Sequence, residues 1–229
     1  MSLRSIFKGW IGEVQTSLGN GLFLDRVTYV SINNLTLNAA NGTTQIDHVI
    51  VSRFGIFVVE TKNMDGWIFG NERDAQWTQS LFGKNFRFQN PLRQNYRHIK
   101  VLSEFLGIPE NKFHSIVMFR GGAKLKTALP PHVMTKGYAR YIKGKSEPIL
   151  EESEVSTIVN ALKAGALPKT WTTRRNHIAG LKSRFESTTT CPKCSSPLVL
   201  RTSKTGPRAG SQFYGCSKFP SCRYVRDAM

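Results

Sequence analysis

Acidic residues are scarce in this chain, which has 15 Asp and Glu against 32 Lys and Arg in 229 residues and a formal net charge of +17. So large an excess of one sign repels itself in a compact fold, which makes solubility alone the weaker explanation for it. A basic surface attracts polyanions, so nucleic acid is the first partner to consider. Adsorption to an anionic membrane surface is a more remote alternative.

Long apolar runs are also missing. The longest, from Ile56 to Val59, has the length of a strand, far short of the roughly 20 residues that cross a bilayer. The opening residues, with Arg4, Lys8 and then Glu13, lack the apolar core of a signal peptide. We therefore expect a cytoplasmic protein without a membrane partner. Because 40% of its residues are hydrophobic, the chain can bury a substantial core, which excludes disorder throughout.

Cysteine is absent from the first 190 residues, and all four cysteines lie in the tail. Residues 169–229 also hold a formal charge of +10, against +7 for residues 1–168. Internal repeats are absent, and the one low-complexity tract is a short Ser-Thr run near residues 187–190. These changes in cysteine content and charge along the chain predict two domains, residues 1–187 and residues 188–229.

The spacing of apolar residues predicts an α/β order of elements. An amphipathic helix over residues 3–18 opens the chain, and a helix capped by Asn90, begun by Pro91 and ended by Gly107 lies in its middle. We expect strands at residues 27–30, 35–37, 46–51, 56–62, 67–69, near Trp77 and at 114–119, and later helices at 151–163 and 176–185. The strands 46–51 and 56–62 flank a tight turn and form a hairpin.

The two arms of this hairpin hold Asp47 and the triplet Glu60-Thr61-Lys62. Alternation along a strand places Glu60 and Lys62 on one face. A turn centred between residues 53 and 54 would set Asp47 opposite Glu60, with the two carboxylates about 5 Å apart and repelling each other. A proton, a nearby cation or a bound divalent metal ion would relieve that repulsion, and neutralising Asp47 in metal-free protein would relieve it too. The alternative is a solvated face or a surface ion pair. The apolar run that leads into Glu60 argues against a solvated strand end.

Several neighbouring residues have competing interpretations. Gln94 and His98 lie one helical turn apart, so both could reach a phosphate, and we favour a supporting role for Gln94. His48 points to the strand face opposite Asp47, where core packing or exposure is favoured over catalysis. The tryptophans Trp67, Trp77 and Trp171 are interpreted as packing residues rather than as platforms for stacked bases.

Taken together, these residues resemble the nuclease-related domain, a branch of the PD-(D/E)xK nuclease superfamily. The resemblance spans roughly residues 10–120 and rests on Gly12-Glu13, Gln45-Ile46-Asp47-His48-Val49, Gly55 to Lys62, Gly66-Trp67-Ile68, Trp77, and Asn90-Pro91 with Gln94 and His98. It implies a restriction-endonuclease-like mixed central sheet flanked by helices. The Pro-Asp pair of the superfamily appears here as Ile46-Asp47, which keeps the ligand.

The same resemblance implies roles for individual residues. Asp47 and Glu60 would bind Mg²⁺ or Mn²⁺, with the Thr61 carbonyl completing the shell, and Lys62 would orient or activate water. Glu13 would add a further carboxylate. A divalent ion lowers the pKa of bound water and neutralises charge that builds on phosphate oxygens. The implied reaction is hydrolysis of phosphodiester bonds.

The cysteines come as two close pairs, Cys191-x2-Cys194 and Cys216-x5-Cys222. Four thiolates delivered in two short turns favour a structural Zn²⁺ site without an open coordination position. Two disulfides are the alternative, which a cytoplasmic protein disfavours. The tail resembles the topoisomerase-type DNA-binding zinc ribbon, with Ser195 where that family often has glycine, and the resemblance implies binding of single strands. Plausible stacking and phosphate contacts are Phe213, Tyr214, Phe219 and Tyr224 with Lys204, Arg208, Lys218, Arg223 and Arg226.

Two functions follow. In the first, the protein is a metal-dependent nuclease that hydrolyses phosphodiester bonds in nucleic acid, DNA above all, while the ribbon tethers it to the substrate. In the second, it is a non-catalytic nucleic-acid-binding or regulatory module whose carboxylates are structural.

Overall fold

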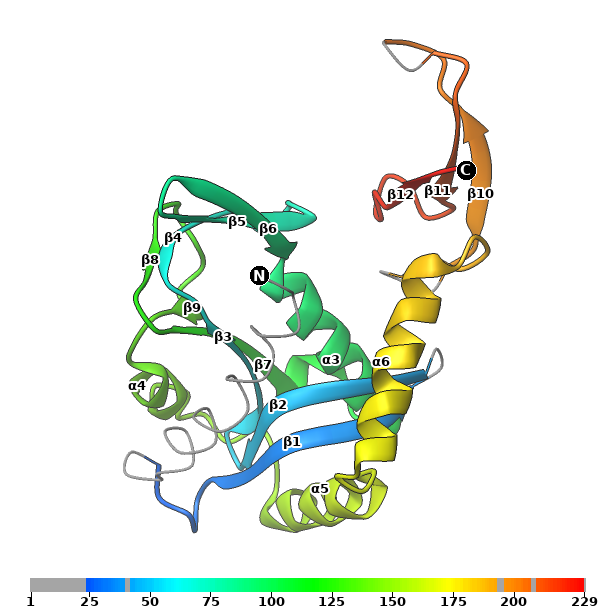
Figure 1. Ribbon diagram of the computed structural model, residues 1–229. Coiled ribbons are helices and arrows are strands. Elements are labelled where there is room, and N and C mark those ends of the chain that lie inside the picture. The colour runs from blue at the N-terminus through cyan, green and yellow to red at the C-terminus, as the bar shows by residue number, and fades with distance from the viewer. Residues whose placement is uncertain (1–23, 40–41, 193–195, 207–208, 229) are drawn as a thin grey trace. The chain divides into compact units, whose positions relative to one another are not determined.

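A computed structural model describes residues 24–39, 42–192, 196–206 and 209–228 (Figure 1). Within these ranges, residues 181–186 are described by their backbone alone. The chain divides into two compact units. The first is Met1–Leu35 with Ile46–Gly165, and the second is Thr36–Gln45 with Ala166–Met229. The predicted helix at residues 3–18 lies outside the described residues. Among the described helices, none is both long and apolar enough to cross a membrane.

The central sheet is mixed. It consists of β1 (Val30–Ala39), β2 (Gly42–Ser52), β3 (Gly55–Asn63), β7 (Phe113–Arg120) and β9 (Val133–Met134), in the order β1-β2-β3-β7-β9. β2 and β3 are antiparallel, whereas β3, β7 and β9 run parallel. The first seven residues of β3 are all buried. Its unbroken apolar run therefore reflects a strand that is covered on both faces.

Helix α3 (Pro91–Leu106) precedes β7 in the chain and packs on β3 and β7 (Figure 1). Its start is fixed by Asn90, whose Oδ1 accepts a hydrogen bond from Leu92 N at 2.9 Å. The Asn90 Nδ2 group also donates to backbone carbonyls of residues 71, 72 and 74. Gly107 ends the helix with φ 67°, a left-handed conformation that favours glycine.

A second sheet follows β3 along the chain. Its strands are β4 (Gly66–Phe69), β5 (Gln76–Leu81), β6 (Lys84–Gln89) and β8 (Ala123–Leu125), in the order β6-β5-β4-β8. Trp77 of β5 is fully buried, and its ring stacks on Phe119 of β7 with 6.0 Å between centroids. Ile68 and Phe88 join the same core. This shared core fixes the second sheet against the first.

Shorter elements complete the first unit. They are the 3₁₀ helix η1 (Glu110–Lys112), α4 (Tyr138–Lys143) and α5 (Glu152–Gly165). Ile142 of α4 packs with Phe57, Val59 and Ile116 in a core on the central sheet. The central sheet is thus flanked by helices, as expected of a mixed α/β fold.

The second unit contains α6 (Trp171–Glu186) and three antiparallel strands, β10 (Leu198–Thr202), β11 (Gln212–Cys216) and β12 (Val225–Asp227). The end of the β1–β2 hairpin belongs to this unit. Leu167 N donates to Thr36 O at 2.9 Å, and Thr43 Oγ1 lies 2.8 Å from His177 Nδ1.

Three expectations about elements need correction. The predicted strand at residues 27–30 is mostly a turn, because Asp25 Oδ1 accepts hydrogen bonds from Val27 N and Thr28 N. The predicted strand at 35–37 is part of the longer β1, which continues through Asn34 at φ 53°, a conformation that asparagine tolerates. The helix predicted at 176–185 begins earlier, because Thr170 caps it through Thr173 N. The elements β6, β8, β9 and α4 were not predicted.

Candidate functional site

The β2–β3 hairpin has the predicted register. Its pairs run from Ser52 opposite Gly55 to His48 opposite Val59, so a turn lies between residues 53 and 54. Gly55 is required here because its φ is 118° and an added Cβ would lie 2.9 Å from Lys112 O. The last of these pairs is His48 with Val59. Asp47 precedes His48 on β2 and Glu60 follows Val59 on β3, so both residues lie just beyond that pair.

Asp47 interacts with Thr61 at this end of the ladder. The Asp47 Oδ2 atom accepts hydrogen bonds from Thr61 N at 2.9 Å and from Thr61 Oγ1 at 2.7 Å. Thr61 is 1% exposed, so its two donors have lost water and need this acceptor. The carboxylate of Asp47 therefore substitutes for a backbone partner at the end of the hairpin.

Glu60 lies at the centre of an ion-pair network. Its side chain is 3% exposed, and its Oε1 accepts from Lys62 Nζ at 2.5 Å. Its other oxygen, Oε2, lies 3.3 Å from His98 Nε2 on α3. The Lys62 ammonium also donates to Gln94 Oε1 at 2.9 Å. The predicted face with Glu60 and Lys62 thus meets Gln94 and His98, one turn apart on α3.

The two carboxyl groups have opposite pKa shifts. Burial and the nearby charge of Glu60 raise the pKa of Asp47, although the Thr61 hydrogen bonds and Lys62 act in the other direction. Burial alone would raise the pKa of Glu60, but the charges and hydrogen bonds of Lys62 and His98 outweigh it and hold that pKa below its usual range. The surroundings therefore favour the charged form of Glu60 and disfavour that of Asp47. Asp47 is held in a site that disfavours its charge, which a bound cation would reverse.

Asn95 positions α3 relative to these strands. Its fully buried Nδ2 lies 2.8 Å from both Val58 O and Ser115 Oγ, and 3.1 Å from Ile116 O. One side chain thus joins α3 to β3 and β7. Because Gln94 precedes it on the helix, this contact also sets where Gln94 meets Lys62.

The cysteines form a second cluster, in the three-stranded part of the second unit. The Sγ atoms of Cys191, Cys216 and Cys222 lie within 4.8 Å of one another. The Cys191 and Cys222 sulfurs are 3.7 Å apart, far beyond the ~2.05 Å of a disulfide bond. Four sulfurs at ~2.3 Å from a tetrahedral Zn²⁺ would lie about 3.8 Å apart, which matches this separation. Cys194 lies outside the described residues.

Two family models match the chain. The model of the nuclease-related domain matches residues 8–120. Residues 8–120 belong to the nuclease-related domain family. The model of the topoisomerase DNA binding C4 zinc finger matches residues 188–228, which contain all four cysteines.

Relatives match over parts of the chain. An uncharacterised Bacillus anthracis protein is 51% identical over 96 residues, which is 41% of this chain and 45% of that protein. The uncharacterised protein YrdD of Escherichia coli is 53% identical over 36 residues, 16% of this chain and 17% of its own length. DNA topoisomerase 1 of Mycoplasma genitalium is 53% identical over 34 residues, 15% of this chain and 4% of its own length. The matched segments thus span less than half of each relative. No solved structure matches the chain.

Within the nuclease-related domain, the structure brings together five residues named from the sequence: Asp47, Glu60, Thr61, Lys62 and Gln94. Glu13 lies outside the described residues. His98, which the sequence left undecided between a surface and a site residue, contacts Glu60. Asn95 was missed, because a buried asparagine in a helix has no distinctive sequence pattern.

His48 lies on the strand face opposite Asp47, as the alternation predicts. It is buried, and its Nδ1 lies 2.8 Å from Asn33 Oδ1. Burial, together with the positive charge of Arg120, lowers the pKa of His48 to about 4, so the ring is neutral at pH 7. It faces a cavity of about 330 Å³ that Leu24 and Tyr29 also line.

The tryptophans divide into two groups. Trp77 is fully buried, as predicted for a packing residue. That prediction is wrong for Trp67 and Trp171, which are 50% and 73% exposed. Both have a cation over the ring, Lys126 at 4.6 Å and Arg175 at 5.4 Å respectively. The average preference of tryptophan for the interior does not decide single positions.

Proposed function

We propose that the nuclease-related domain of this chain is a Mg²⁺- or Mn²⁺-dependent phosphodiesterase that cleaves nucleic acid, DNA above all, and that the cysteine-rich tail tethers it to the substrate. The observation that supports the proposal best is the contact of one partly buried ammonium, Lys62, with both Glu60 and Gln94, on the strand that also holds Thr61 against Asp47. Two carboxylates, a lysine and an amide from three elements thus lie near the end of the β2–β3 pairing.

The donor set fits a hard divalent cation. Asp47 and Glu60 offer carboxylate oxygens, which are the ligands that Mg²⁺ and Mn²⁺ prefer. Burial and the charge of Glu60 raise the pKa of Asp47 despite Lys62 and the Thr61 hydrogen bonds, so further positive charge beside this carboxyl group would favour its ionised form. A divalent ion between the two carboxylates would supply that charge, and the Thr61 carbonyl would be a third oxygen ligand. When bound, the ion would acidify a water molecule and stabilise charge on the phosphate.

The residues of the chain have separable tasks in this proposal. Lys62 keeps its ammonium at the Glu60 carboxylate, where it can stabilise negative charge on an attacking oxygen or on the phosphate. Gln94 orients Lys62 through its Oε1 and leaves its amide nitrogen to contact a phosphate oxygen. His98 holds Glu60 from the helix side, which fixes the carboxylate in one orientation.

The tail has the features of a nucleic-acid anchor. The side chains of Phe219, Lys218, Arg223 and Lys204 are exposed on it. Arg226 is engaged differently, because its Nη1 donates to Ser187 O at 3.3 Å. Zn²⁺ on four cysteines would be structural, since four thiolates leave no open position. Exposed aromatic and basic side chains supply stacking and phosphate contacts for a single strand.

A second candidate is a binding module without turnover. The observation that favours it is the closed network on Glu60, whose two oxygens already contact Lys62 and His98. Such a carboxylate is satisfied without a metal ion. In this case the same residues would stabilise the end of the sheet rather than act on a phosphate.

A cleavage assay separates the two candidates. The purified protein is incubated with labelled single- and double-stranded DNA and RNA, in Mg²⁺, in Mn²⁺ and in EDTA. We expect cleavage that requires the divalent ion in the wild type and that is lost in Asp47→Asn and Lys62→Gln. Both substitutions keep a polar group at the site, so the buried partners Thr61 and Glu60 are not left alone.

Lys100→Gln is the matched control, because Lys100 pairs with Glu110 on the surface of the same domain. It should cleave like the wild type. Zinc content and nucleic-acid affinity should be unchanged in all three variants. Persistent cleavage in Lys62→Gln, or cleavage in EDTA, would exclude this hairpin as the site of metal-dependent hydrolysis.

A further inference from the structure

The second sheet, β6-β5-β4-β8, has an exposed face on which aromatic and basic side chains meet. Paired residues of neighbouring strands share a face, and Trp67 pairs with both Ser80 and Lys124. Likewise Phe69 pairs with Thr78, and Thr78 with Arg87. The opposite face holds the buried Ile68 and Trp77. We call the side with Trp67, Phe69, Lys124 and Arg87 the outer face.

The aromatic side chains of the outer face are only partly covered. Trp67 is 50% exposed, and its ring meets that of Phe69 edge-on at 6.4 Å between centroids. Lys126 Nζ lies 4.6 Å from the centre of the Trp67 ring, a cation–π arrangement that restrains the indole. An exposed, restrained ring beside exposed cations is the arrangement that stacks a nucleobase and pairs with its phosphates.

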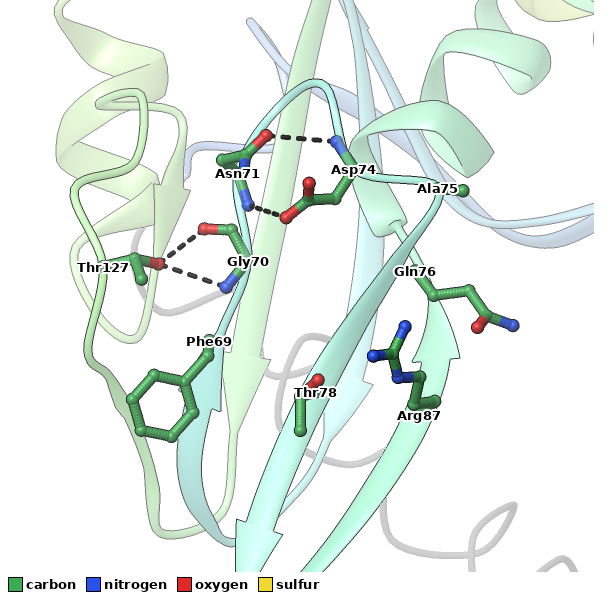
Figure 2. A pocket seen from close by; sticks show the side chains of 9 residues that line it. All are labelled: Phe69, Gly70, Asn71, Asp74, Ala75, Gln76, Thr78, Arg87 and Thr127. Carbon is green, nitrogen blue, oxygen red and sulfur yellow. Dashed lines mark hydrogen bonds between the residues drawn. The ribbon is translucent and has the colours of Figure 1, made fainter. Parts of the chain in front are cut away.

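A cavity of about 480 Å³ adjoins Phe69. Figure 2 shows Thr78 between Phe69 on β4 and Arg87 on β6, with Gln76 beside the guanidinium. The hydroxyl, amide and guanidinium groups could hydrogen-bond a base edge or a phosphate. The opposite wall is already ordered, since Thr127 Oγ1 donates to Gly70 O at 2.6 Å. The one carboxylate in the lining, Asp74, accepts a hydrogen bond from Asn71 N at 3.1 Å.

We propose that the outer face binds single-stranded nucleic acid, with an unpaired base stacked on Trp67 and neighbouring phosphates on Lys124, Lys126 and Arg87. Three cations around one exposed aromatic pair complement a polyanion with accessible bases. A duplex hides the faces of its bases, so the stacking contact selects single strands. This binding site goes beyond the proposed hydrolysis and does not depend on it.

The outer face is also linked rigidly to the hairpin site. Trp67 follows Lys62 by five residues, at most about 17 Å of extended chain. The joint between β3 and β4 is fixed by Asp65, whose Oδ1 accepts from Gly122 N at 2.7 Å and whose carbonyl accepts from Gln79 Nε2 at 2.7 Å. Gly66 adopts φ 82°, and an added Cβ would lie 2.4 Å from Ser80 O. A strand bound on the outer face would therefore stay near Glu60 and Lys62.

The test uses the full chain in EDTA, so that cleavage plays no part. A fluorescently labelled thymidine oligonucleotide is titrated with the wild type, Trp67→Ala, Trp67→Phe and the triple variant Arg87→Gln, Lys124→Gln, Lys126→Gln. Trp67→Ala should weaken binding about tenfold, and Trp67→Phe should restore most of the affinity. The triple variant should weaken binding and reduce the dependence of affinity on salt.

Tyr96→Ala is the matched control, because Tyr96 is 54% exposed and has Lys100 over its ring. It should bind like the wild type. Thermal melting of each variant verifies folding, which substitutions at exposed positions should leave unchanged.

A second measurement separates binding by the outer face from binding by the tail. An oligonucleotide with photoactivatable 5-iodouracil should crosslink to Trp67 or Phe69, and mass spectrometry locates the crosslink. Equal affinities in Trp67→Ala and Tyr96→Ala, with crosslinks confined to the tail, would overturn the proposal, as would equal binding of a duplex.

Discussion

Replacing Asp47 tests what this carboxylate does when no metal ion is bound. Its pKa is raised by burial and by Glu60, so ionising it costs the folded state free energy. The associated stability is present below the unfolded pKa of about 3.9 and is lost as pH rises through the folded pKa. At pH 7 in EDTA, neutralising Asp47 alone should therefore stabilise the fold.

The hydrogen bonds of Thr61 oppose that gain in Asp47→Ala. Both donors of Thr61, its N–H and its hydroxyl, rely on Asp47 Oδ2, and Thr61 is almost fully buried. A buried donor without an acceptor costs about 1–3 kcal/mol. Asp47→Asn removes the charge but keeps an oxygen acceptor. We therefore expect Asp47→Asn to be more stable than Asp47→Ala by about 1–3 kcal/mol.

The assay is urea denaturation in EDTA at pH 7, followed by tryptophan fluorescence. A double-mutant cycle with Thr61→Val isolates the hydroxyl, because this substitution removes Oγ1 and keeps the N–H. Thr61→Val should destabilise the wild type but have little effect in Asp47→Ala, with a coupling of about 0.5–3 kcal/mol. If Asp47→Ala equals or exceeds Asp47→Asn in stability and the coupling is zero, the Thr61 contacts do not stabilise the fold and this account of Asp47 is wrong.

Three further predictions follow from the structure. Because Lys62 and His98 lower the pKa of Glu60, its charge stabilises the fold above the unfolded pKa of about 4.3 and this stability is lost as pH falls through the folded pKa. Glu60→Gln should thus flatten the loss of stability below about pH 5 in a denaturation series, and an unchanged slope would contradict this. Gly70→Ala should cost about 1–3 kcal/mol because its Cβ would lie 2.3 Å from Trp77, whereas Gly180→Ala, with no atom within 4 Å, should stabilise α6 by up to ~1 kcal/mol. Wild type should contain close to one zinc per chain by metal analysis, and Cys222→Ala should lose it; full zinc in Cys222→Ala would refute the assignment.

The sequence predicted the candidate site better than it predicted the surrounding sheet. The tight turn between residues 53 and 54 specifies the hairpin register, and alternation along the strand then places Glu60 and Lys62 on one face. Helical spacing predicts that Gln94 and His98 share a face of the helix, and in the structure Gln94 contacts Lys62 and His98 contacts Glu60. The catalytic roles of these residues remain predictions.

The less predictable parts depend on tertiary contacts. Strands β6, β8 and β9 have short or mixed patterns, and β6 pairs with β5 despite having mostly exposed residues. The exposure of Trp67 is set by which face of the second sheet packs on Phe119, and local sequence does not encode that choice. Asn34 is misleading in the opposite way. Asparagine favours turns and so suggests a break between strands, but β1 continues through it.

The contact of the β1–β2 hairpin end with α6 makes the order of synthesis matter. Thr43 meets His177 across 134 residues of chain, and Thr36 meets Leu167. At about 5–20 residues per second, the ribosome needs about 7–27 s to add that length. Throughout this interval the hairpin end, including the fully buried Leu37, has been made while its partner has not. Folding of the nascent chain is thus expected to finish late, and chains released early would present this apolar strand end to chaperones and proteases.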